Sequence, residues 1–352
     1  MENAAKIGGP GVALFERKHT ILSELEKHPF RPPRWLRNAH AQTLYAALVR
    51  LRDRVPLRRE RWTTPDGDFL DVHVCDGVAD HPTVLVLHGL EGSVRSKYVC
   101  GLMATLRAAG WSSICMEFRS CGREMNRARR MYHSGETTDL AFVAGRLIET
   151  CERLYIAGFS LGGNVLAKWL GELGEEVPDR VRAAAVISAP FDLTVSGPHI
   201  DRAAGGFYSR HFLRSLIKKA IMKEMQHPGC VDIARIRRSR TLYEFDTHAT
   251  ARLHGFRDAD HYWGTQRCCL YLPRIRIPTL LVSSSDDPFN PGSTLPREIA
   301  ERSPYLCPMF TEAGGHVGFV QGPMPLRTRY WAEEQTFRFF QACDALDTER
   351  EG

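Results

Sequence analysis

The sequence predicts an α/β fold in which a mostly parallel sheet carries helices on both faces. Short apolar runs rich in β-branched residues recur along the chain, and segments with helical spacing separate them. The chain has 352 residues, of which 43% are hydrophobic and 25% charged, an ordinary composition for a globular protein. This length allows one large α/β domain with an insertion, or two smaller domains.

The chain is predicted to open with a helix and then an arm, both within residues 1–55. In the arm, Pro32-Pro33 forces an extended or turn conformation, and the apolar residues are expected to pack on the core. A hairpin follows, because residues 61–64 and 69–74 alternate on either side of the Asp-Gly turn in Pro65-Asp66-Gly67-Asp68.

The remaining core elements are predicted to alternate between strand and helix. The predicted strands are residues 83–87, 113–118, 154–157, 181–187, 279–282 and 306–310. The predicted helices are residues 97–109, with Gly110 as the C-cap, 138–150, 164–170 and 327–342. This order of elements is typical of a parallel sheet with crossover helices.

One segment interrupts the alternation. Residues 191–272 lie between two predicted core strands and are polar, basic and helical in spacing. We expect an inserted cap or lid rather than an independent domain. The predicted organisation is an N-terminal arm (1–55), a core (56–190 and 273–345) and a cap (191–272).

Ser160 lies in Gly158-Phe159-Ser160-Leu161-Gly162-Gly163, between a predicted strand and a predicted helix. Gly-x-Ser-x-Gly by itself is a common match, but the strand before it and the helix after it favour a nucleophile elbow. In such an elbow the serine has a strained backbone with positive φ, which the neighbouring small residues permit. The N–H of Leu161 can then face a developing oxyanion.

A serine nucleophile requires a base, and the base requires a carboxylate to orient it. His316 is the predicted base, because it lies in a glycine-rich loop between the last core strand and the last helix. Asp287 is the predicted acid, because it follows the strand at 279–282. Asp286 is the alternative acid, and either aspartate could instead stabilise a turn or helix start. The order serine, acid, histidine is that of α/β hydrolases.

His88-Gly89-Leu90-Glu91-Gly92-Ser93 follows an early predicted strand. In α/β hydrolases this loop supplies the second backbone donor to the oxyanion, and we assign that donor to Leu90. His88 is expected to shape the loop rather than to act as a base.

Charge and cysteine content narrow the classes of function. The net charge of +6 is modest. Basic clusters occur at 58–61, 127–130 and 235–240, and we expect them to be solvated surface. The alternative is that they attract anionic lipid weakly. No nucleic-acid-binding motif, apolar stretch of roughly 20 residues or secretory signal is present. Ten scattered cysteines without a Cys-x-x-Cys pair argue against a disulfide framework or zinc site, so we predict a cytoplasmic protein.

Further short motifs are spread along the chain. They are Phe30-Arg31-Pro32-Pro33, Trp35-Leu36-Arg37-Asn38-Ala39-His40, Gln42-Thr43, Asn126-Arg127, Tyr132-His133-Ser134-Gly135-Glu136-Thr137, Asp139-Leu140, Phe245-Asp246, Thr250, His254-Gly255-Phe256, Tyr262, Asp286-Asp287-Pro288-Phe289 and Gly314-Gly315-His316-Val317-Gly318-Phe319. Together they resemble the motifs of the YheT-like family of the α/β-hydrolase superfamily, which includes the embryogenesis-associated hydrolases. The resemblance extends from about residue 29 to residue 340.

The resemblance implies a serine carboxylic-ester hydrolase that uses no metal or organic cofactor and acts on short- to medium-chain acyl or lipid esters. Two alternatives stay open: an acyl transferase that favours an alcohol over water, and a ligand-binding protein that kept the fold without turnover. The sequence gives no basis for assigning an oligomeric state.

Overall fold

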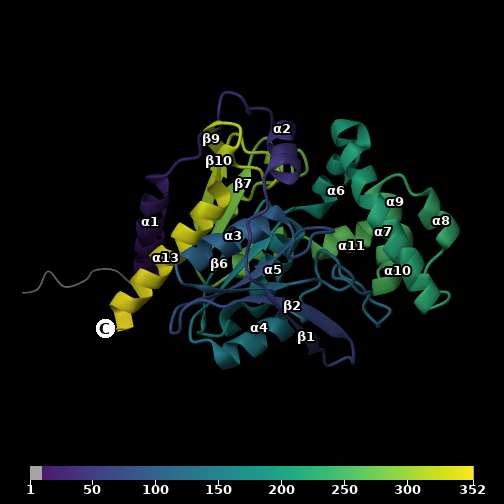
Figure 1. Cartoon of the computed structure of the whole chain (residues 1–352), viewed down its shortest axis with the longest axis horizontal. Coiled ribbons are helices and arrows are strands. Elements are labelled where there is room, and N and C mark those ends of the chain that lie inside the picture. The colour runs from purple at the N-terminus through teal and green to yellow at the C-terminus, as the bar shows by residue number, and fades with distance from the viewer. Residues whose placement is uncertain (1–9, 352) are drawn as a thin grey trace, which may run out of the picture.

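The computed structural model describes residues 10–351, which form an α/β fold around an eight-stranded sheet (Figure 1). The strands are β1 (Arg58–Thr63), β2 (Phe69–Cys75), β3 (Thr83–Leu87), β4 (Ser112–Met116), β5 (Leu154–Phe159), β6 (Val181–Ile187), β7 (Thr279–Ser284), β8 (Leu306–Thr311), β9 (Val320–Met324) and β10 (Arg327–Tyr330). The order in the large sheet is β1-β2-β4-β3-β5-β6-β7-β8, and β9 and β10 form a separate hairpin. β2 pairs antiparallel with β1 and β4, and all other neighbours in the large sheet are parallel.

Helices connect the strands and extend the chain at both ends. The α-helices are α1 (Pro10–Glu26), α2 (Ala39–Leu44), α3 (Lys97–Ala108), α4 (Thr138–Thr150), α5 (Leu161–Leu173), α6 (Leu193–Arg202), α7 (Phe207–Gln226), α8 (Ile233–Arg238), α9 (Leu242–Phe245), α10 (Ala251–His254), α11 (Ala259–Gln266), α12 (Arg297–Arg302) and α13 (Trp331–Glu351). Two π-helical turns, η1 (Tyr45–Val49) and η4 (Asp246–Thr250), continue α2 and α9.

Helices cover both faces of the sheet, as the sequence predicts. The central strand β5 is buried along its whole length, which is typical of a parallel strand packed on both sides. Apolar residues of α4, α5 and α12 pack in one core cluster on one face. Apolar residues of α1, α3 and α13 form a second cluster on the opposite face.

The predicted helix over residues 327–342 is wrong at its start. Arg327–Tyr330 form β10, which pairs antiparallel with β9, and α13 begins at Trp331. Exposed and half-buried residues alternate along β10, as in a strand with one face against the protein. Pairing with β9 therefore determines the conformation here, although the residues from Trp331 onward are helical as expected.

The other predicted elements are confirmed, with boundaries that differ by a few residues. The N-terminal helix is α1, although residues 1–9 of the predicted arm lie outside the described residues. The arm after α1 packs on the core through Phe30, whose ring centroid lies 5.6 Å from that of Phe319 and 5.5 Å from that of Trp331. The arm thus contacts the core through an aromatic side chain.

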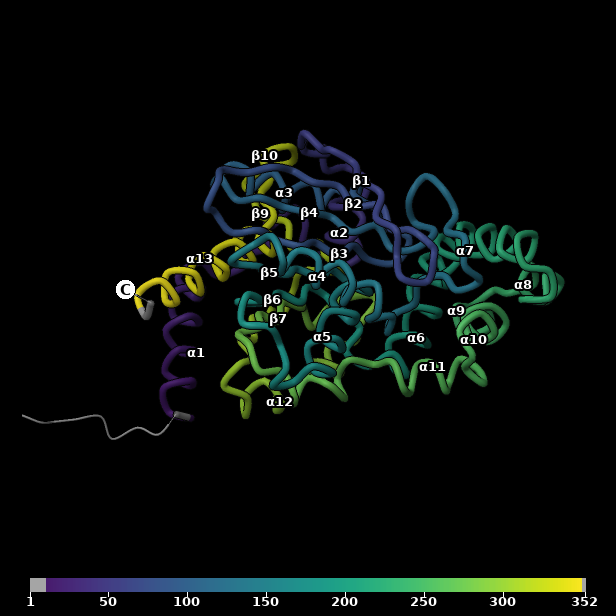
Figure 2. The backbone as a smooth tube through the Cα atoms, turned by 90° about the horizontal axis from the view of Figure 1, so that it is seen from below, coloured from purple at the N-terminus to yellow at the C-terminus, as the bar shows by residue number. Residues whose placement is uncertain are grey.

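Between β6 and β7 the chain forms the helices α6 to α11, which we call the inserted helices. They occupy one end of the molecule, while α1 and α13 lie at the other (Figures 1 and 2). The inserted helices have an apolar cluster of their own, which includes Leu213, Leu216 and Phe245. In the part of the chain that the structure describes, no helix has both the length and the apolar character needed to cross a bilayer.

A buried guanidinium joins the start of the sheet to the loop after β4. The Arg119 side chain donates to Asp68 at 2.8 Å and to both carboxylate oxygens of Asp139 at 2.8 Å. Because Asp68 lies in the β1–β2 turn and Asp139 in α4, this ion-pair network links three elements that are distant in sequence. Loss of the guanidinium would leave Asp68 without a cationic partner in a buried site, which is destabilising.

Candidate active site

Ser160 lies at the sharp turn between β5 and α5, with φ of 52° and ψ of −120°. This confirms the positive φ that the sequence predicts for the elbow. At Gly162, a Cβ atom would lie only 2.6 Å from the carbonyl oxygen of His88, so the helix approaches the neighbouring loop too closely for a side chain. The Ser160 side chain makes no capping hydrogen bond to α5, and its hydroxyl group faces the adjacent histidine.

Three predicted side chains meet at this turn. His316 Nε2 lies 2.9 Å from Ser160 Oγ, and His316 Nδ1 lies 2.9 Å from Asp287 Oδ2. His316 is 8% exposed and Asp287 is 3% exposed. An ionised Asp287 accepts the Nδ1–H of a neutral imidazole, which leaves the lone pair of Nε2 directed at the serine hydroxyl.

The two neighbouring aspartates have different partners. Asp287 Oδ1 accepts the backbone N–H of Phe289 at 2.7 Å, while its Oδ2 faces His316. Asp286 Oδ1 instead accepts the backbone N–H of Gly315 at 2.9 Å. The geometry therefore favours Asp287 over Asp286 as the carboxylate that orients the imidazole, and it places Asp286 under the histidine loop.

Two residues of the site were not identified from the sequence. Asn290 Nδ2 donates to Asp287 Oδ2 at 3.2 Å and to the carbonyl oxygen of Ser188 at 3.1 Å, so it fixes the carboxylate. The Phe289 ring stacks on the His316 imidazole with centroids 4.1 Å apart. The turn formed by the residues after Asp287 was a possible signal, because aspartate side chains often accept backbone N–H groups two residues onward.

The N-terminal arm holds the histidine loop through polar contacts as well as apolar ones. Thr43 Oγ1 accepts the N–H of His316 at 2.9 Å, and Gln42 Oε1 accepts the N–H of Val320 at 2.7 Å. Gly315 has φ of 63°, and a Cβ atom there would lie 2.5 Å from the carbonyl oxygen of Ala39. The arm and the loop thus fit against each other at backbone distance.

The two predicted oxyanion donors differ from their neighbours in hydrogen bonding. The N–H groups of Gly89 and Glu91 donate to tyrosine hydroxyl groups at 2.9 and 3.0 Å, and that of Gly92 donates to the Gly89 carbonyl at 3.0 Å. Within residues 10–351, the N–H of Leu90 has no protein acceptor. Leu161 is the first residue of α5, where helix geometry leaves N–H groups unpaired.

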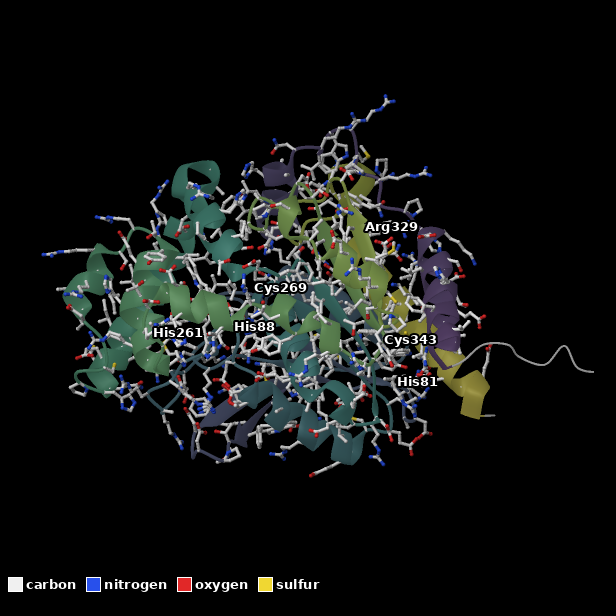
Figure 3. The ribbon with its side chains drawn as sticks, turned by 180° about the vertical axis from the view of Figure 1, so that it is seen from behind. His81, His88, His261, Cys269, Arg329 and Cys343 are labelled. Carbon is white, nitrogen blue, oxygen red and sulfur yellow. The ribbon has the colours of Figure 1, made fainter. Side chains whose placement is uncertain are left out.

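His88 is fully buried and is satisfied within the loop. Its Nδ1–H donates to the carbonyl oxygen of Gly89 at 2.8 Å, and its Nε2 accepts the N–H of Phe118 at 3.1 Å. Burial lowers the pKa of His88 to about 4, so the ring is neutral. Figure 3 shows it in the middle of the molecule, and its contacts fit the structural role that the sequence predicts.

Glu91, the residue after Leu90, connects this loop to the inserted helices. Its backbone has φ of 54°, and its Oε1 accepts the hydroxyl of Tyr132 at 2.6 Å. Lys219 of α7 donates to the same oxygen at 2.7 Å. This ion pair was not identified from the sequence, because its partners are more than a hundred residues apart.

A cavity of about 530 Å³ opens above Ser160 and His316, between the core and the inserted helices. Its walls are mainly apolar and include Met131, Ile200 and Phe212. A cavity of this size that is mainly apolar, with a few polar groups at one end, is typical of a site for a small organic ligand.

His133, Glu136 and His254 form a cluster in which one ligand atom from each residue lies within 4.8 Å of the others. The carboxylate of Glu136 already pairs with the guanidinium of Arg130 at 2.9 Å, and His133 Nδ1 accepts the N–H of Gly135 at 3.1 Å. A neutral His133 that accepts at Nδ1 carries its proton on Nε2, which leaves no lone pair directed at an ion. We therefore interpret the cluster as a contact between core and inserted helices.

Comparison with known proteins places the chain among the α/β hydrolases. A family model described as "alpha/beta hydrolase fold" matches residues 82–219. The protein of Escherichia coli (strain K12) named "Putative esterase YheT" is 36% identical over 87% of this chain and 91% of that protein. Phospholipase ABHD3 of Mus musculus is 25% identical over 92% of this chain and 80% of that protein.

Solved structures agree at the level of the fold. The esterase Pf2001 of Pyrococcus furiosus superimposes with a TM-score of 0.55 at 17% identity, over 83% of this chain and 93% of that chain. The identity to YheT over most of both sequences is the finding that assigns the family. The chain therefore belongs to the α/β-hydrolase superfamily and, within it, to the YheT-like family of ester hydrolases.

Proposed function

We propose that this protein hydrolyses carboxylic esters through an acyl-enzyme formed on Ser160. The observation that carries the proposal is the pair of 2.9 Å contacts that connect Ser160 to His316 and His316 to Asp287. Acyl transfer to serine requires a serine that is hydrogen-bonded to a histidine, and a carboxylate that orients the histidine. Here the serine lies on a nucleophile elbow and the carboxylate is buried.

In the proposed mechanism, Ser160 Oγ attacks the acyl carbon while His316 Nε2 takes the hydroxyl proton. Asp287 keeps the imidazole in the required tautomer and stabilises its positive charge. The N–H groups of Leu90 and Leu161 stabilise the oxyanion, and each such donor contributes a factor of about 10²–10³ in rate. His316 then protonates the departing alcohol, and a water molecule activated by the same imidazole releases the acid. The proposal includes no metal or organic cofactor.

The substrate is proposed to be an ester of a short- to medium-chain acid, or a lipid ester. The apolar cavity above Ser160 supports this, because it can receive an alkyl chain next to the nucleophile. We propose that residues 191–272 act as a cap over a core formed by 56–190 and 273–345, since inserted and core residues line the same cavity.

The ten free cysteines support the proposal of a cytoplasmic location, where thiols stay reduced.

Substitution of the nucleophile tests the proposal. We expect Ser160→Ala to reduce hydrolysis of p-nitrophenyl butyrate and octanoate to the level of the uncatalysed reaction, because no other hydroxyl replaces Oγ. A fluorophosphonate probe should label the wild type and not the variant. Ser23→Ala, which changes an exposed serine of α1, is the matched control and should keep full activity. Wild-type turnover in Ser160→Ala would refute the assignment, and a new ester formed with added ethanol would indicate acyl transfer.

A further inference from the structure

Four apolar side chains are exposed at the surface around the cavity. They are Leu48 (70% exposed), Val49 (48%), Leu51 (80%) and Phe207 (48%), and we call them the apolar rim. Leu48 and Phe207 also line the cavity that holds Ser160, so the rim lies at its mouth. Leu48 belongs to the turn after α2 on the core side, and Phe207 begins α7 among the inserted helices (Figure 1).

The outward orientation of the rim is fixed by its neighbours. Arg50, between Val49 and Leu51, is buried, and its Nη2 donates to Glu333 Oε2 of α13 at 2.8 Å. Its guanidinium carbon also lies 3.5 Å from the ring centroid of Tyr330. Because this side chain is anchored inward, the residues on either side of it are directed to solvent. An exposed apolar group held in this way requires an explanation other than loose packing.

Basic residues flank the rim. Arg52 and Arg54 follow Leu51 and are exposed, with Asp53, which pairs with Arg50, between them. Arg95 and Lys97 line the cavity. Across residues 10–351, none of these four cations has a carboxylate partner. Apolar side chains next to unpaired cations are typical of surfaces that bind anionic membranes, where the apolar groups enter the interface and the cations contact headgroups.

We propose that the apolar rim docks on an anionic lipid bilayer, so that the cavity mouth opens onto the acyl layer. The inference rests on the proposed function, since a membrane-facing mouth has a purpose only if the cavity takes a lipid ester. It favours a bilayer over a protein partner because two of the four rim residues, Leu48 and Phe207, line an apolar cavity. An ester with a long apolar portion could then enter without crossing water.

Paired variants outside the cavity lining test the proposal. We expect Val49→Ser/Leu51→Ser to weaken cosedimentation with phosphatidylcholine vesicles that contain phosphatidylglycerol by about tenfold. Arg52→Gln/Arg54→Gln should weaken it by about tenfold at low salt, with the loss vanishing near 1 M salt, where the Debye length is about 3 Å. Vesicles of phosphatidylcholine alone should bind the wild type more weakly. Met225→Ser is the matched apolar control, because Met225 is 76% exposed and lies away from the cavity.

Soluble substrate separates docking from catalysis. Turnover of p-nitrophenyl butyrate should remain at the wild-type level in all these variants, while turnover of an ester carried in anionic vesicles should fall with binding. Equal vesicle binding by wild type and both paired variants would overturn the docking proposal and leave the esterase proposal intact. If vesicle binding depends on the rim but the wild type shows no esterase activity, the esterase proposal would be overturned and the docking proposal would stand. If the wild type forms a dimer without lipid and Val49→Ser/Leu51→Ser converts it to a monomer, the rim is an interface between two copies of the chain. That result would also overturn the docking proposal.

Discussion

Ser160 illustrates how single residues carry strain at this site. Its positive φ is unusual for a side chain with a Cβ atom and costs on the order of 1–3 kcal/mol. Three backbone hydrogen bonds maintain it: its N–H donates to the carbonyl of Ile187 at 2.7 Å, and its carbonyl accepts the N–H groups of Gly163 at 2.9 Å and Asn164 at 3.1 Å. The strain places the hydroxyl within 2.9 Å of the imidazole instead of at the helix cap.

The two adjacent aspartates should be separable by substitution. Asp287→Asn removes the negative charge and leaves a single acceptor oxygen, which the backbone N–H of Phe289 would hold, so an amide NH2 group would face His316 Nδ1 and favour the wrong tautomer. We therefore expect kcat for p-nitrophenyl butyrate to fall by about 10⁴. Asp286→Asn keeps an oxygen that can accept the N–H of Gly315, so its kcat should fall by less than about tenfold.

Measuring kcat and the unfolding midpoint of both variants separates catalysis from folding. A variant that loses activity should still unfold as cooperatively as the wild type. If Asp286→Asn were the more damaged enzyme, the assignment of the carboxylate would have to be reversed.

At the scale of elements, α7 supports the loop that carries the Leu90 N–H. Lys219 of α7 and the hydroxyl of Tyr132 both donate to Glu91 Oε1, and the carboxylate and the ammonium group are both largely buried. A buried carboxylate that loses its cation is costly, so the loop would be expected to move if α7 no longer supplied it. Lys219 is thus a positioning residue, which acts on the reaction through Glu91 and Leu90.

Lys219→Met keeps the apolar stem of the side chain but removes the charge. We expect kcat to fall by about tenfold with a smaller change in KM, because an oxyanion donor acts on the transition state more than on the bound substrate. Lys219→Arg should restore most of the loss, whereas the exposed neighbour Lys218→Met should have wild-type kinetics. A change in KM alone would indicate that Lys219 contacts substrate instead.

At the scale of the whole molecule, core and inserted helices meet at paired histidines. The ring centroids of His133, in a core loop, and His254, in α10, lie 4.5 Å apart. Burial lowers the pKa of His254 to about 4 and holds the pKa of His133 well below its usual range. Both rings are therefore neutral at neutral pH, and a charge on either would be buried at this junction.

The buried histidine pair predicts that the free energy of unfolding falls as the pH is lowered. In the unfolded chain the two imidazoles bind protons near pH 6.5, but in the folded protein His254 does so only near pH 4. Between these values the unfolded state binds more protons, so the free energy of unfolding should decrease as pH falls from 6.5 toward 4. His254→Gln should make this decrease shallower, as measured by urea unfolding at several pH values.

Replacement of an exposed histidine is the control for that measurement. His19→Gln, on α1 and away from the junction, should leave the slope unchanged. If the free energy of unfolding changes with pH by the same amount in the wild type and both variants, other groups, such as the buried carboxylates, control how acid lowers the stability.

Much of the fold and the chemistry was predictable from the sequence, because both depend on local patterns. The alternation of apolar and helical segments predicts the parallel sheet, and the small residues around Ser160 predict the elbow. The order of Ser160, Asp287 and His316 along the chain also predicts their meeting at one edge of the sheet, since parallel strands bring the following loops together.

Only the tertiary structure decided which groups face each other across that edge. The sequence favoured Asp287 but left Asp286 open, because one residue of turn geometry determines which carboxylate reaches the imidazole. The ion pair of Glu91 with Lys219, the support of His316 by Thr43 and the strand at Arg327–Tyr330 likewise depend on contacts between distant segments. Local propensity determines the elements, whereas the packing of loops on the finished sheet determines the hydrogen bonds that orient the reacting groups.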